Sequence, residues 1–177
     1  VENVYLMGGD NLVLEGSRGH DNVQGNEGNN RLTGGIDGDD TLFGNGGNDL
    51  IDGGTGHDSL NGGAGADEVL GGDGNDVVRG KGGDDEIEGG AGDDTITGDN
   101  GNDTILAGEG IDVIRPGPGA DTLVFDSALE MDGDFVRGFL SGTDVIDLSG
   151  IEDAGFDWLG TGGFTGNAME LRYRVTA

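Results

Sequence analysis

Cysteine is absent from this chain of 177 residues, so neither disulfide bonds nor a thiolate metal site can hold it together. Proline occurs twice, tryptophan once, and aromatic residues make up 5% of the chain, so we expect no wide conventional core. No apolar run approaches the roughly 18 residues of a transmembrane helix. Residues 1–14 lack the charged and then apolar pattern of a signal peptide, so we expect any export signal to lie elsewhere.

Basic residues are also scarce, because 8 Lys and Arg stand against 36 Asp and Glu, which gives a formal charge of −28. Such a chain repels nucleic acid phosphates and anionic membrane surfaces, and its natural partners are cations. By charge and hydropathy alone it would be disordered, since it buries too little apolar surface to offset chain entropy. Something must neutralise it, and a divalent cation is the candidate that remains.

Glycine is abundant, with 42 residues, and it follows a nine-residue period from Gly16 to Val124. The period comprises twelve nonapeptides and one inserted residue near Ile36. The fourth position is always glycine, as in Gly19 and Gly119. The sixth position is Asn30 in one repeat and aspartate in the other eleven: Asp21, Asp40, Asp49, Asp58, Asp67, Asp76, Asp85, Asp94, Asp103, Asp112 and Asp121.

The period assigns a role to each position. The first six residues of a repeat, rich in glycine, predict a tight turn, and the last three predict a short strand. The eighth residue is always aliphatic, as in Val23, Leu60 and Ile96, and we expect it to face inward while its neighbours face outward. One repeat buries almost nothing, so stability requires stacking into an all-β solenoid. The alternative, a low-complexity acidic linker, does not explain the unbroken glycine and aliphatic positions.

The pattern G-G-x-G-x-D-x-U-x is intact in residues 53–61, 62–70, 71–79 and 89–97, and it resembles the repeats-in-toxin (RTX) nonapeptide. The resemblance implies a right-handed parallel β-roll in which two nonapeptides make one turn, so about six turns here. It also implies that the sixth-position aspartates bind several Ca²⁺ ions and that carbonyls of the turns complete each shell. The glycines that match are Gly44, Gly53, Gly62, Gly71, Gly80, Gly89 and Gly98 at the first position, and Gly56, Gly65, Gly74, Gly83, Gly92 and Gly101 at the fourth.

If successive repeats alternate between two edges of the roll, the sixth residues form two stacks. Neighbours in a stack would lie about 4.8 Å apart, the spacing between strands. Each such pair of carboxylates repels by about 3 kcal/mol at an effective dielectric of 20. Ca²⁺ removes the repulsion because it accepts 6 to 8 oxygens in flexible geometry, whereas Mg²⁺ demands near-ideal octahedral geometry. We expect weaker binding at the terminal loops, where Asn30, Ala107 and Pro116 depart from the pattern.

The two ends differ from the repeats. Residues 1–15 resemble a degenerate first coil, and residues 125–177, with five of six Phe, predict a β-rich C-terminal cap. Residues 120–125, 134–148 and 156–173 resemble the C-terminal region of serralysin-type metalloproteases. Gly138 replaces the aspartate usual there, which argues against an ion bound at that point. Relatives continue beyond Tyr173, so we expect this chain to be a fragment.

No catalytic signature accompanies the repeats. His20 and His57 fall two coils apart, roughly 10 Å, so they cannot share a zinc ion. No H-E-x-x-H, G-x-S-x-G, P-loop or G-x-G-x-x-G motif occurs, and paired acids such as Asp84 and Asp85 recur with the period. We therefore expect a non-catalytic calcium-binding module of a type I secreted, extracellular bacterial protein, attached to an upstream catalytic or adhesive domain. The alternative is an adhesin or ligand-binding segment stiffened by calcium.

Overall fold

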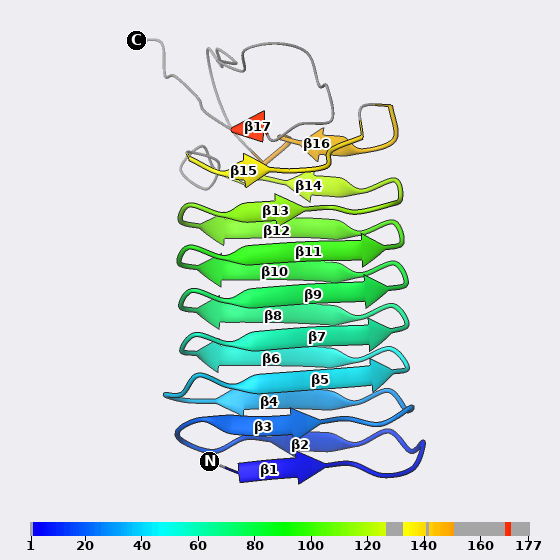
Figure 1. The fold of residues 1–177 in the computed structure, drawn as a ribbon, viewed down its shortest axis with the longest axis vertical. Helices are drawn as coiled ribbons and strands as arrows, with labels where there is room; N and C mark the ends of the chain where they lie inside the picture. The colour runs from blue at the N-terminus through cyan, green and yellow to red at the C-terminus, as the bar shows by residue number, and fades with distance from the viewer. Residues whose placement is uncertain (1, 127–132, 141, 151–168, 171–177) are drawn as a thin grey trace.

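The computed structural model describes residues 2–126, 133–140, 142–150 and 169–170, and these form a rod of stacked β-strands with no helix among them (Figure 1). The strands belong to two sheets, one of odd-numbered and one of even-numbered strands. The nine-stranded sheet contains β1 (Glu2–Tyr5), β3 (Asp21–Gln24), β5 (Thr41–Gly46), β7 (Ser59–Ala64), β9 (Val77–Gly82), β11 (Thr95–Asn100), β13 (Val113–Arg115), β15 (Phe135–Val136) and β17 (Met169–Glu170). The eight-stranded sheet contains β2 (Val13–Glu15), β4 (Arg31–Gly35), β6 (Leu50–Thr55), β8 (Glu68–Asp73), β10 (Glu86–Ala91), β12 (Thr104–Glu109), β14 (Thr122–Val124) and β16 (Val145–Asp147).

Each nonapeptide supplies one strand, from β3 to β14, and each strand pairs in parallel with the strand two places along the chain. Two strands thus make one turn of a solenoid, as predicted. The twelve repeats give six turns, and β1 with β2 adds a turn before them. The one antiparallel pair among the described strands is β15 with β17. Figure 1 shows the turns stacked along one axis, with β1 at one end and β15 and β16 at the other.

The core is a ladder one aliphatic residue wide in each sheet. Every eighth-position side chain is buried, with at most 1% of its surface exposed, and its two strand neighbours are less buried. The period-two alternation of a strand explains this, because only every second side chain reaches the space between the sheets. The ladder comprises Val23, Leu32, Leu42, Ile51, Leu60, Val69, Val78, Ile87, Ile96, Ile105, Ile114 and Leu123. Phe125, Val136 and Phe139 continue it toward the C-terminal end.

The strands are longer than the sequence predicted. Eight of the twelve repeat strands, β5 to β12, contain six residues, because they run through the last three positions of one repeat and the first three of the next, as in β7 from Ser59 to Ala64. The turn therefore comprises only the fourth to sixth positions. Glycines at the first and second positions join the sheet through their main chain alone, for example Gly54 opposite Gly72. The expectation of a six-residue turn and a three-residue strand was wrong for this reason.

The inserted residue near Ile36 does not disturb the register. Val23 still pairs with Leu42 and Leu42 with Leu60, so the ladder continues across the longer repeat. The extra residue is taken up in the loop before β5, where Asp37 adopts the left-handed conformation with φ of 62°. Aspartate tolerates this region better than most residues, which explains why the insertion remains local.

Candidate metal-binding edges

The sixth-position side chains form two buried columns, one along each edge of the rod. The first edge comprises the loops that lead into the odd-numbered strands, on the left in Figure 1, and the second edge comprises those that lead into the even-numbered strands. All twelve sixth-position residues are buried, with at most 4% of their surface exposed. The first-edge column contains Asp21, Asp40, Asp58, Asp76, Asp94 and Asp112, and the second-edge column contains Asn30, Asp49, Asp67, Asp85, Asp103 and Asp121.

One oxygen of each carboxylate is held by the neighbouring turn. The main-chain N–H of Asp49 donates to Oδ1 of Asp67 at 2.8 Å, and the N–H of Asp67 donates to Oδ1 of Asp85 at 2.9 Å. The first edge repeats the contact, with 2.7 Å from the N–H of Asp58 to Oδ1 of Asp76. Each sixth residue therefore donates to the side chain one turn later, so the stacks predicted from the spacing exist and are regular.

The second oxygen of these carboxylates has no hydrogen-bond partner. It is buried and unpaired in nine sixth-position residues: Asp49, Asp58, Asp67, Asp76, Asp85, Asp94, Asp103, Asp112 and Asp121. A buried unpaired carboxylate oxygen is costly, and a regular series of them requires an explanation. A cation beside each oxygen would supply that explanation.

Asn30 shows what the unpaired oxygen lacks. Its Oδ1 faces the first-position Gly25, as Oδ2 does in the aspartate loops, and it accepts the N–H of Asn26 at 2.9 Å. Its Nδ2 donates to the carbonyl oxygen of Gly28 at 2.5 Å and to Oδ1 of Asn26 at 3.0 Å. A carboxylate cannot make these bonds because it has no proton to donate. In the aspartate loops the corresponding Oδ2 has no such donor, and a cation beside it would supply the missing contact.

The unpaired carboxylates also hold protons more tightly than usual. Loss of solvent is the largest cause, the main-chain hydrogen bond to Oδ1 opposes it, and neighbouring carboxylates add to it in most cases. The pKa rises from 3.8 to about 6 for Asp58, Asp67, Asp103 and Asp112, and to about 7 for Asp85 and Asp94. The pKa of Asp40, Asp49, Asp76 and Asp121 is raised for the same main reason.

First-position glycines lie against the unpaired oxygens. A Cβ added to Gly53 would stand 2.5 Å from Oδ2 of Asp58 and 2.5 Å from the carbonyl oxygen of Gly71. Side-chain and main-chain oxygens thus converge on the space that a larger residue would fill. The same overlap with the carboxylate of the repeat occurs at Gly44, Gly62, Gly71, Gly80, Gly89 and Gly98. The predicted fourth-position glycines all have positive φ, and a Cβ added to any of them would overlap the main chain of the turn before it. They are Gly56, Gly65, Gly74, Gly83, Gly92 and Gly101.

The donor set fits a hard cation that accepts main-chain oxygens. Among the described residues no three His, Asp or Glu side chains meet closely enough to hold an ion by themselves. Any ion in these loops must therefore take most of its oxygens from the backbone, which Ca²⁺ does readily with 6 to 8 ligands. The identity of each ligand remains a prediction.

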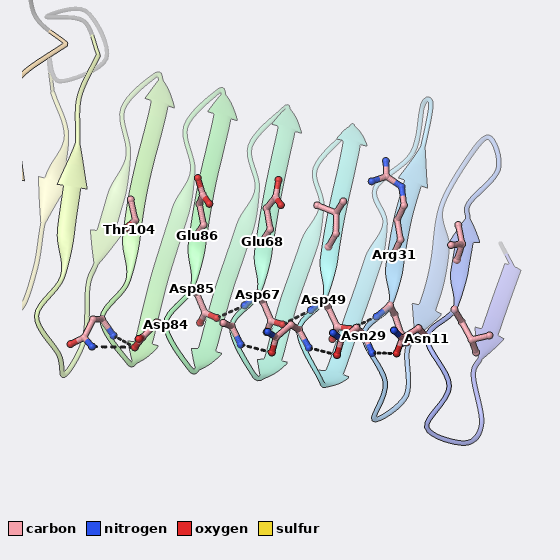
Figure 2. A pocket seen from close by; sticks show the side chains of 17 residues that line it. Asn11, Asn29, Arg31, Asp49, Asp67, Glu68, Asp84, Asp85, Glu86 and Thr104 are labelled. Atoms are coloured by element: carbon pink, nitrogen blue, oxygen red, sulfur yellow. Dashed lines mark hydrogen bonds between the residues drawn. The ribbon is translucent and has the colours of Figure 1, made fainter.

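A second ladder, which the sequence analysis missed, lies beside each column. The fifth-position side chain accepts a hydrogen bond from the N–H of the fifth residue one turn later, as from Asn48 to Oδ1 of Asn29 at 2.9 Å and from Ala66 to Oδ1 of Asn48 at 3.1 Å. Figure 2 shows this ladder beside the second-edge column, where the loops line a groove of about 660 Å³. Nine of the twelve fifth positions carry Asn, Asp or His, a signal that the sequence offered.

His20 and His57 belong to the fifth-position ladder of the first edge. Nδ1 of His57 accepts the N–H of Asn75 at 2.8 Å, and Oδ1 of Asp39 accepts the N–H of His57 at 3.0 Å. Asp39 therefore lies between the two imidazoles, which are two turns apart as expected. Both histidines act as rungs of the ladder.

Two aspartates beyond the repeats extend the columns. The N–H of Asp112 donates to Oδ1 of Asp134 at 2.8 Å, and the N–H of Asp121 donates to Oδ1 of Asp144 at 3.3 Å. These positions were matched to the cap motif but were not predicted as part of the columns. Gly138 is exposed between them, with φ of 82°. Residues 156–168 and 171–173 of the predicted cap motif lie outside the described residues.

Comparison with known families points to the same loops. A family model described as the RTX calcium-binding nonapeptide repeat (4 copies) matches residues 8–37, 15–49, 34–69, 70–105 and 97–127. A comparison with curated proteins gave no match. In the part of the chain that the structure describes, no helix is long and apolar enough to cross a membrane.

Proposed function

Because the chain belongs to the RTX calcium-binding nonapeptide repeat family, we propose that it is a calcium-triggered folding module of a secreted bacterial protein. Calcium binding itself is the property of the family. The finer proposal is that the module is unfolded where calcium is scarce, folds outside the cell, and thereby supports the secretion and stability of an attached domain. The observation that carries it is the series of nine buried, unpaired carboxylate oxygens.

The negative charge of the chain supports the proposal that folding depends on calcium. Without cations the chain must stack carboxylates one strand apart, and each adjacent pair costs about 3 kcal/mol at an effective dielectric of 20. Several such pairs outweigh the roughly 5 to 15 kcal/mol that stabilises an ordinary domain. The aliphatic ladder alone is thin, so metal-free chains favour the unfolded state. Bound Ca²⁺ replaces repulsion by attraction, and folding becomes linked to calcium by mass action.

The affinity range of extracellular calcium modules fits this role. They bind at about 10⁻⁴ to 10⁻³ M, so micromolar calcium leaves them empty and millimolar calcium fills them. A fold that depends on this difference distinguishes the two sides of the cell envelope. Secretion in an extended state and folding after exit would follow.

Circular dichroism and small-angle scattering during a calcium titration test the proposal. We expect an expanded, disordered chain in chelator and a compact β-rich rod in millimolar Ca²⁺, with a cooperative midpoint between about 0.1 and 1 mM. Equal concentrations of Mg²⁺ and a matching ionic strength of NaCl serve as controls and should not fold it. A β-rich, compact chain in chelator would contradict the proposal.

We also propose that the module has no catalytic activity of its own. Two classes of titratable group in the repeats are engaged in periodic structural contacts: the sixth-position aspartates in the columns and the histidines in the fifth-position ladder. Assays of the purified, calcium-folded chain against peptide, ester and glycoside substrates should give only background rates. Activity that disappears with a single substitution would overturn this part.

A further inference from the structure

The two loops at the start of the repeats differ from the other loops in how the sixth residue is satisfied. In residues 16–21, Oδ2 of Asp21 accepts the N–H of Ser17 at 2.7 Å and its Oγ–H at 3.1 Å. In residues 25–30, Asn30 is bonded to Asn26 and Gly28 through both of its side-chain atoms. Neither Asp21 nor Asn30 belongs to the nine residues whose second side-chain atom is unpaired.

The network in residues 25–30 is closed. The N–H of Gly28 donates to Oδ1 of Asn26 at 2.8 Å, and Nδ2 of Asn26 donates to the carbonyl oxygen of Asp10 in the preceding turn at 3.1 Å. The N–H of Asn30 still donates to Oδ1 of Asp49 at 2.7 Å, so the loop joins the column in register. Asn26 and Asn30 are both buried, with 5% and 3% exposed. Both polar side-chain atoms of Asn26 and both of Asn30 thus have a partner without a cation.

The backbone at the second position makes the difference, because polar residues such as Asn45 and Asp99 also stand there in later loops, but with positive φ. Ser17 and Asn26 supply polar side chains there, whereas most aspartate loops have glycine, as at Gly54, Gly63 and Gly72. Those glycines have positive φ, while Ser17 and Asn26 do not, so the first two loops also follow a different backbone path. The turn before them ends the second-edge column with an apolar residue, since Leu12 stands where Asn30 and Asp49 stand in later turns.

Resting on the proposed calcium function, we propose that residues 16–21 and 25–30 are cation-free loops, in which hydrogen bonds from the second-position residue take the place of the ion. They close the N-terminal ends of both columns, and ion binding begins with the next turn. In residues 25–30 the side-chain oxygen that faces Gly25 already accepts the N–H of Asn26, and the amide of Asn30 adds no charge to the column. Each edge thus binds one ion fewer than its loop count.

Counting bound ions in the full chain with its calcium-folded structure tests this. The matched variants are Asn30→Asp, which replaces the amide by a carboxylate next to the Gly28 carbonyl and Asn26 Oδ1, and Asn61→Asp, which adds the same charge on the outer face of β7. Native mass spectrometry and equilibrium dialysis with ⁴⁵Ca²⁺ give the stoichiometry. We expect one additional ion for Asn30→Asp and no change for Asn61→Asp.

A second variant keeps the test decisive if Asn30→Asp does not fold. Asn26→Gly removes the acceptor for the Gly28 N–H and for Asn30 Nδ2, so we expect a less stable module with an unchanged number of ions. An Asn30→Asp chain that folds yet binds no additional ion would overturn the inference, and so would an Asn26→Gly chain that loses an ion. A wild-type chain that takes up no Ca²⁺ would instead contradict the proposed function itself.

Discussion

Nine of the sixth-position aspartates divide their two oxygens between two tasks. Oδ1 holds the neighbouring turn through a main-chain N–H, as in Asp76, which accepts from Asp58, and Oδ2, which has no hydrogen-bond partner, would contact the proposed cation. Replacement by asparagine therefore preserves the first task and removes the charge needed for the second. This division explains why a column of like charges can also be a column of hydrogen bonds.

The raised pKa values of these residues give the metal-free chain an unusual pH dependence. A group whose pKa is higher in the folded state than the usual 3.8 favours folding when protonated, so its contribution is present at low pH and is lost as pH rises through the folded value. For Asp58 and Asp94 those folded values are about 6 and about 7. In chelator, we expect acidification from pH 8 to pH 5 to increase β-structure measured by circular dichroism.

Calcium reverses the sign of this dependence. Protons compete with Ca²⁺ for the same carboxylates, so the calcium midpoint should rise as pH falls below about 7. Sedimentation velocity is a necessary control because the isoelectric point is about 4.1 and association must be excluded. Metal-free β-structure that decreases steadily from pH 8 to pH 5 would contradict the raised pKa values.

The fourth-position glycines are the residues least tolerant of a side chain. Gly74 has φ of 138°, and a Cβ there would overlap the carbonyl oxygen of Gly56 one turn earlier. We expect Gly74→Ala to lower the stability of the calcium-bound rod by at least about 1 to 3 kcal/mol. Gly82→Ala is the matched control, since its nearest neighbour would be the Gly63 carbonyl oxygen at 3.9 Å. Urea denaturation in saturating calcium compares them, and equal losses would refute the argument.

At the scale of single strands and loops, the fifth-position ladder shows where stability can be gained. Ala66 interrupts the second-edge ladder: its N–H donates to Oδ1 of Asn48, but its methyl group cannot accept the corresponding bond from the N–H of Asp84 one turn later. Ala66→Asn should extend the ladder toward Asp84 and stabilise the folded rod by about 0.5 to 1.5 kcal/mol. Ala64→Asn, an exposed site outside the ladder, should have no such effect. Thermal melts in saturating calcium distinguish the two.

The elements also show what a sequence pattern can and cannot predict. The ladder from Val23 to Leu123 followed from the period, because each rung is a side chain that recurs every nine residues. The ends of the strands could not be predicted from the period, because glycines such as Gly54 pair through the main chain and leave no side-chain pattern. Asp134 and Asp144 joined the columns across gaps of 22 and 23 residues, which no fixed period reveals.

The whole molecule behaves as a one-dimensional stack, in which each turn contacts only the turns before and after it. A defect in the middle divides the rod into two shorter stacks, whereas a defect near the end shortens it slightly. We expect Asp85→Asn to reduce the steepness of the calcium titration more than Asp121→Asn, although both remove one buried unpaired oxygen. Far-UV circular dichroism over a series of calcium concentrations measures the steepness of the folding transition, and identical steepness in the two variants would argue against nearest-neighbour coupling.

The two hydrogen-bonded columns run in opposite senses: a sixth residue donates to the turn that follows, and a fifth residue donates to the turn that precedes it. Past the insertion, both bridge residues that are 18 apart in sequence. Eighteen residues are therefore a modular length. A duplication or excision of that size, placed inside the array, would leave every later residue on its original sheet and edge, so such rods can change length in whole turns while keeping their geometry.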